Sequence, residues 1–183
     1  MKNNFSELIE YFENIARTHV EIQHTDNEKH FFRFELDEVL SGIQRSDVAY
    51  PMLVLESYVF DFTDNLSDNI LKNRSGAFIL LDHCPDISDY DKIHEIWDNL
   101  EQIADDILIK IKSDKKNPST PVIRGFSFST VDAKLIANEM GNSIGIRFTF
   151  TISSPVPSDP DGSRWLDYLN GRWPGSGSGV HSV

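Results

Sequence analysis

The sequence predicts an α+β domain in which helices pack on a mainly antiparallel sheet of about four strands. Three observations lead to this fold class. Residues 50–62 and 77–82 form a β-rich block, residues 90–112 form one long amphipathic helix, and residues 122–130 and 144–152 form a second β-rich block. The chain of 183 residues is long enough for one domain of ordinary size and too short for two comfortable ones.

The region before the first β block predicts one helix and contains one segment that fits either a helix or a strand. Apolar residues at spacings of three and four predict an amphipathic N-terminal helix over 5–18 that packs on the sheet. Residues 19–29 are polar and predict a connection or a weak strand. We expect a short helix over 36–44, although Phe31-Phe32-Arg33-Phe34 fits the start of a strand equally well.

The first β block has apolar residues on both of its faces, so both faces are expected to be covered. Pro51 opens a strand that continues to Phe62. Strict alternation assigns one face to Met52, Val54, Tyr58, Phe60 and Phe62, and the other to Leu53, Leu55 and Val59. Residues 64–75 are polar and predict a loop or an excursion, and residues 77–81 predict a short buried strand.

The long helix has the clearest pattern in the chain. Ser88 and Asp91 form an S-x-x-D start signal. One continuous apolar stripe follows: Ile93, Ile96, Trp97, Leu100, Ile103, Ala104, Ile107, Leu108 and Ile111. Carboxylates gather near the helix start and lysines near its end, as the helix macrodipole favours. We interpret them as a solvated face, with an acidic surface for a basic partner as the alternative.

The second β block alternates between apolar and polar residues, with Phe126 and Phe128 on one face of its first strand. Its second strand places its apolar residues on one face: Ile144, Ile146, Phe148, Phe150 and Ile152. Residues 132–142 between the two strands predict a longer turn or a short helical excursion.

The composition changes at residue 153, which divides the chain into a domain over 1–152 and an extended tail over 153–183. Proline and glycine are frequent in the tail, and it cannot fold on its own. We expect its large side chains and arginines to contact another subunit, and folding back on the same domain is the alternative. The predicted interface residues are Arg164, Trp165, Leu166, Tyr168, Leu169, Arg172 and Trp173. The two arginines are expected to pair with an acidic helix face such as Asp98, Glu101 and Asp105.

Charge and composition exclude several classes of function. A formal net charge of −12 disfavours direct nucleic-acid binding, which depends on lysine and arginine at phosphates. No apolar run reaches the length of about 20 residues that crosses a bilayer. The single cysteine, Cys84, cannot form an internal disulfide. The sequence therefore predicts a soluble intracellular protein.

Residues that suggest chemistry are few. Asp82-His83-Cys84-Pro85-Asp86 groups possible metal ligands, but no second cysteine or histidine pair accompanies them, so no metal site is expected. Phosphate-binding, dinucleotide-binding and serine-hydrolase motifs are absent from the sequence. We predict no catalytic residue and no cofactor. Carboxylates around Asp82 and Asp86 that converge only in the fold keep an enzyme open as a minor alternative.

Five segments carry a resemblance to a known family: residues 30–40, 50–56, 76–81, 93–112 and 144–150. In order and hydrophobic texture they resemble the tail-terminator, or tail-completion, proteins of long-tailed bacteriophages and phage-like particles. The resemblance implies a non-enzymatic virion protein assembled in the host cytoplasm, of which six copies form a ring. It implies that the ring caps the tail tube, ends tube polymerisation and joins the tail to neck or connector proteins. A small adaptor or binding module is the alternative.

Overall fold

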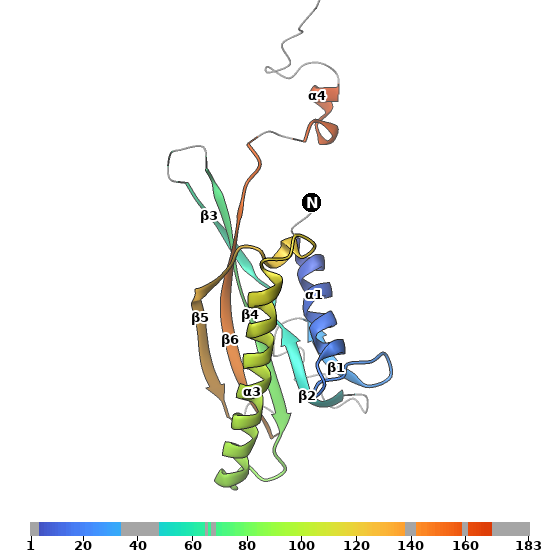
Figure 1. Ribbon diagram of the computed structural model, residues 1–183, viewed down its shortest axis with the longest axis vertical. Coiled ribbons are helices and arrows are strands. Elements are labelled where there is room, and N and C mark those ends of the chain that lie inside the picture. The colour runs from blue at the N-terminus through green and yellow to red at the C-terminus, as the bar shows by residue number, and fades with distance from the viewer. Residues whose placement is uncertain are drawn as a thin grey trace, which may run out of the picture.

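The computed structural model describes residues 4–33, 48–64, 66, 69–137, 142–158 and 161–169. It contains a six-stranded sheet with two long helices on one face, α1 and α3 (Figure 1). The α+β class agrees with the sequence. The expected sheet of about four mainly antiparallel strands is wrong, because the sheet has six strands and is mixed.

The strands follow one another across the sheet in the order β1-β2-β4-β6-β5, and β3 pairs with β4. Their bounds are β1 Lys29–Arg33, β2 Val48–Leu55, β3 Val59–Thr63, β4 Leu71–His83, β5 Phe126–Ile136 and β6 Ser143–Pro155. β1 pairs with β2 in parallel, and the other pairs are antiparallel. β1 begins inside the segment read as a polar connection. The expected helix over 36–44 lies outside the described residues.

The helices agree closely with the apolar periodicity. α1 spans Phe5–Thr18, and the Asn4 side chain caps it by accepting a hydrogen bond from the backbone N–H of Glu7 at 3.0 Å. α3 spans Tyr90–Asp114 and is capped by Asp89, whose carboxylate accepts from the Lys92 N–H at 3.0 Å. The cap is therefore one residue beyond Ser88, which the start signal had favoured.

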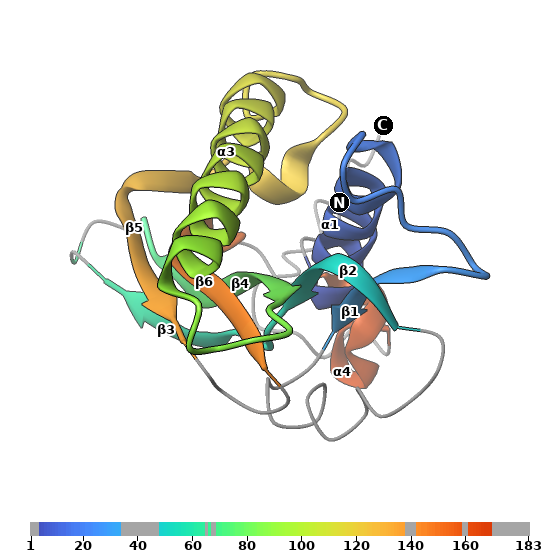
Figure 2. The same ribbon diagram turned by 90° about the horizontal axis from the view of Figure 1, so that it is seen from below.

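The main core lies between the two helices and the sheet, as the view from below shows (Figure 2). Phe12 of α1 lies against Phe78 of β4 and Phe150 of β6, with ring centroids 5.6 and 5.9 Å apart. Phe78 also stacks on Phe148 at 5.0 Å. A smaller cluster on the opposite face contains Met52, Val54, Ile79, Leu81 and Ile136. We call these two sides the helix face and the open face of the sheet.

A β-bulge separates β2 from β3 and changes which side chains share a face. Leu55 pairs with Phe78 and Val59 with Ser75, so three residues on one strand stand opposite two on the other. The extra residue shifts the alternation by one position. Tyr58 consequently joins the helix-face core of Leu53 and Leu55, where the prediction had placed it with Met52 and Val54.

Two strands are longer than predicted because their additional residues are polar. β4 begins at Leu71, inside the segment 64–75 for which the sequence predicts a loop or an excursion. β5 continues to Ile136, inside the segment 132–142 that was read as a turn or helix. Both extensions run beside β6, which supplies their backbone hydrogen-bond partners. Polar side chains on a partly exposed strand resemble loop composition in sequence, although the backbone of both extensions pairs with β6.

The β3–β4 hairpin extends beyond the ends of the helices, together with the end of β6 (Figure 1). We call this projecting part the arm. β6 extends to Pro155 and pairs with the start of β4, and the Val156 N–H donates to the Ile70 carbonyl oxygen at 2.9 Å. The chain then leads away from the sheet to η2, Gly162–Arg164, and α4, Leu166–Leu169.

Candidate functional site

The C-terminal segment carries large apolar side chains that are exposed. Trp165 is 51% exposed, Leu166 77% and Leu169 64%. Figure 1 places α4 beyond the end of the sheet, away from the helices. Three of the predicted anchors therefore project from the domain. Tyr168 lies in α4, and Arg172 and Trp173 lie outside the described residues.

Local hydrogen bonds organise this segment. The carboxylate of Asp161 accepts from the Ser163 N–H at 3.2 Å and from the Ser163 hydroxyl at 2.6 Å, and these bonds lower the pKa of Asp161. Arg164 lies 3.7 Å from the same carboxyl group. Within one chain Arg164 thus pairs with Asp161. Its pairing with the acidic helix face of another copy stays a prediction. Trp165 directly follows this turn, η2, which the Asp161 side chain caps.

The arm carries a second exposed apolar surface, which the sequence did not single out. All five residues of β3 are exposed, including Phe60 at 54% and Phe62 at 57%. Their rings meet edge to face at 5.9 Å, and the Lys72 ammonium lies 3.9 Å from the Phe60 ring centroid. The bulge turns Phe60 and Phe62 toward the helix side, beyond the end of the helices. We call Phe60, Phe62 and Lys72 the arm face.

The other side of the arm is polar and internally hydrogen-bonded. The Asn73 amide donates to Asp61 at 2.9 Å and to the Thr63 hydroxyl at 2.8 Å, and the Ser153 hydroxyl donates to Asn73 at 2.8 Å. These bonds link β3, β4 and β6 and stiffen the arm. The arm therefore has one apolar, cationic side and one satisfied polar side.

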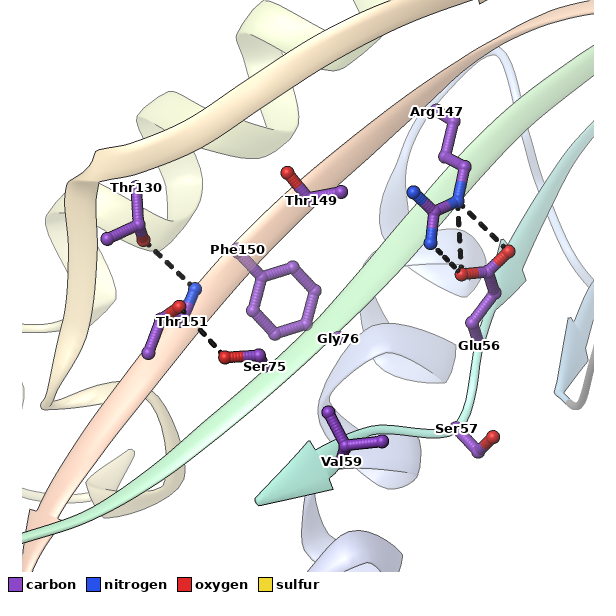
Figure 3. Close-up of a pocket in the computed structure, with 10 residues that line it drawn as sticks. All are labelled: Glu56, Ser57, Val59, Ser75, Gly76, Thr130, Arg147, Thr149, Phe150 and Thr151. Atoms are coloured by element: carbon purple, nitrogen blue, oxygen red, sulfur yellow. Dashed lines mark hydrogen bonds and ion pairs between the residues drawn. The ribbon is translucent and has the colours of Figure 1, made fainter. Parts of the chain in front are cut away.

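A hollow of about 460 Å³ lies on the open face (Figure 3). At one end Arg147 and Glu56 form a bidentate ion pair, with Nε 3.1 Å from both carboxylate oxygens and Nη2 2.5 Å from Oε2. Hydroxyl groups occupy the other end: the Ser75 and Thr151 hydroxyls are 3.2 Å apart, and Thr130 accepts from the Thr151 N–H at 3.0 Å. The hollow suits an uncharged polar ligand or an extended peptide.

The residues that had suggested a metal do not converge. The Asp82 carboxylate accepts from the His83 N–H at 2.7 Å, while Asp86 accepts from the Ser88 N–H and hydroxyl at 2.9 and 2.6 Å. Cys84 is buried, and its thiol donates to the Asp86 carbonyl oxygen at 3.2 Å. Within the described ranges, no three histidine, cysteine, aspartate or glutamate side chains form a group that could hold a metal ion.

Burial raises the pKa of Asp82, whereas the hydrogen bonds from Ser88 lower the pKa of Asp86. Two carboxyl groups with opposite shifts can serve as an acid and a base when both face one substrate. Here Asp82 lines a hollow beside α3, with Lys92 and Glu95 among its neighbours, and Asp86 is not among the lining residues. The geometry of these two side chains therefore gives no support to a shared reaction centre.

Sequence reasoning missed the arm face and the Glu56–Arg147 pair. The ion pair joins residues 91 positions apart, and no spacing rule links them. Phe60 and Phe62 alternate with polar residues as ordinary strand residues do, so their exposure is visible only in the fold.

A scan against protein-family models finds no match to this chain, and a search of curated proteins finds none. Among the helices of the described part of the chain, none is both long and apolar enough to cross a membrane.

Proposed function

We propose that the protein is a non-catalytic structural protein whose copies assemble into a ring. The ring caps the tail tube of a phage or phage-like particle, ends tube polymerisation and joins the tail to the neck. Its partners are further copies of this chain, the tail tube protein and the neck or connector proteins. The observation that carries the proposal is the exposed anchor set Trp165, Leu166 and Leu169 on a segment projecting from the domain.

The energetics of these side chains favour contact with another chain. Tryptophan and leucine gain roughly 1.5 to 3 kcal/mol each on full burial, and aromatic anchors dominate many interfaces. A projecting segment reaches a neighbouring copy more readily than it reaches the core of its own domain, where α1 and α3 already cover the helix face. Contacts of this head-to-tail kind close into rings when the rotation between copies permits.

The arrangement of the helices and strands also supports the proposed function. The resemblance to tail-terminator proteins rests on helices packed on a sheet, and α1, α3 and the six strands have this arrangement. A ring subunit also needs surfaces on two different sides, since each copy contacts two neighbours. The projecting segment and the arm are two such surfaces.

The experiment compares the purified full-length chain with the double variant Trp165→Ala/Leu169→Ala. Light scattering after size-exclusion chromatography should give a multiple of the monomer mass for the original chain and a lower mass for the variant. Electron micrographs should show rings, and added rings should limit the length of tubes grown from tail tube protein. Val20→Ala, at a residue 76% exposed beyond α1, is the matched control and should assemble normally. A monomer at every concentration tested would refute the proposal.

A binding module is the second candidate, and the open-face hollow favours it. The Glu56–Arg147 pair and the hydroxyl groups of Ser75 and Thr151 offer fixed polar contacts to a ligand. This function predicts a monomer that retains a ligand or peptide in mass spectra recorded under native conditions. The Arg147→Met variant should then lose the ligand.

A further inference from the structure

A cluster of carboxylates lies at the start of α3, at the opposite end of this helix from the arm. Where β4 ends and α3 begins, five exposed carboxylates gather: Asp86, Asp89, Asp91, Glu95 and Asp98. Two exposed apolar side chains lie among them, Tyr90 at 71% and Ile87 at 37% exposure. We call these seven residues the acidic end. The arm projects beyond the other end of α3 (Figure 1).

The arm face matches the acidic end in two independent respects. Phe60 and Phe62 offer aromatic surface where the acidic end offers Tyr90 and Ile87. Lys72 offers a cation, held over the Phe60 ring, where the acidic end has an excess of carboxylates. Lys92 lies beside the acidic end and forms an ion pair with Glu95 at 2.7 Å.

The arm face and the acidic end of one chain cannot touch each other. Figure 1 places them toward opposite ends of α3, separated by the length of this helix. Their complementarity can therefore be satisfied only between two chains. We propose that the arm face of one copy docks on the acidic end of a second copy, with Phe60 and Phe62 against Tyr90 and Ile87 and Lys72 among the carboxylates.

This contact rests on the proposed function and specifies it, because it names the two surfaces that meet between neighbouring copies. It is heterologous, since two different surfaces meet, and so a pair of copies keeps one free arm face and one free acidic end for further neighbours. The aromatic part supplies most of the affinity, and the charged part sets orientation and the salt dependence.

The experiment uses two full-length variants, each with one surface disabled. The arm variant is Phe60→Ala/Lys72→Glu, and the acidic-end variant is Tyr90→Ala/Asp91→Lys. Each alone should associate at least about thirtyfold more weakly than the original chain, because an interface anchor is lost and the charge match is reversed. An equimolar mixture still contains one intact arm face and one intact acidic end, so it should form a two-chain complex that contains one copy of each variant.

The controls are Lys134→Glu and Glu10→Lys, which make the same charge changes at exposed residues of β5 and α1. Both should associate as the original chain does. Raising the salt concentration should weaken association of the original chain because the Debye length falls to about 3 Å at 1 M.

Two results would overturn this contact: variants that assemble as the original chain does, or a mixture that stays monomeric. In the first case the proposed function stands and assembly uses other surfaces, such as Trp165 and Leu169. If the mixture pairs as expected but micrographs of the original chain show closed two-copy particles and no ring, the contact is supported and the tube-capping proposal fails. A chain that never associates refutes both.

Discussion

Replacing Phe12 by alanine tests the packing of α1 on the sheet. Phe12 has no exposed surface, and its ring lies against Phe78 and Phe150 at the centre of the helix-face core. Truncation of a fully buried phenylalanine to alanine costs about 3 to 5 kcal/mol, because burial is lost and a cavity remains. The two ring contacts place Phe12→Ala toward the upper part of this range.

The assay is urea-induced unfolding followed by circular dichroism, at one fixed protein concentration because association adds stability to the folded chain. Phe12→Leu keeps most of the apolar volume and should lose less than about 1.5 kcal/mol. The urea dependence, m, should stay unchanged, so that the difference reports the folded state. A loss below about 1 kcal/mol for Phe12→Ala would show that α1 does not pack on β4 and β6 as described.

Three further substitutions test other contacts. Glu56→Gln should lower the free energy of unfolding by about 1 to 2 kcal/mol, because the Arg147 guanidinium loses the negative charge of Glu56. This loss should be smaller at high salt, and thermal unfolding at two salt concentrations measures it. Burial raises the pKa of Asp82, so protonation of this carboxyl stabilises the folded chain, and that stabilisation is lost as the pH rises through the raised pKa. Asp82→Asn should therefore raise the melting temperature at pH 7, and the gain should vanish below about pH 3. Gly125→Ala would place Cβ 1.6 Å from the Ser153 carbonyl oxygen, and should cost about 3 kcal/mol in chemical unfolding as the strand ends move apart.

The sequence predicts the helices well because their apolar stripes face a single core. The predicted range 5–18 coincides with α1, and the predicted range 90–112 ends two residues before α3 does. Each stripe repeats over several turns, so a local error in one residue does not change the assignment.

The strands are predicted less well because they depend on partners distant in the chain. The segment is apolar on both faces, so its apolar pattern does not reveal the bulge at 56–58. The bulge reverses the side of the sheet on which Tyr58, Phe60 and Phe62 lie. Residues 71–75 and 132–136 have polar side chains, and only pairing with β6 makes them strands. Parallel pairing of β1 with β2 likewise has no local signal.

One part of the candidate site could likewise be predicted from the sequence, and another part could not. The exposure of Trp165, Leu166 and Leu169 could be predicted, because large apolar side chains in a segment rich in proline and glycine have no core of their own. The arm face could not, because the exposure of Phe60 and Phe62 follows from the bulge and from where the helices end.

An exposed apolar edge strand usually invites uncontrolled pairing, and features of β3 limit it. β3 has only five residues, and Asp61 places a charge in its centre. Lys72 adds a positive charge over the Phe60 ring, so an approaching strand of the same kind would meet a like charge. The net charge of −12 makes most approaches between copies repulsive as well. An approach that brings Lys72 to the carboxylates of the acidic end is attractive, so in the proposed contact the same charges that oppose aggregation would favour one orientation.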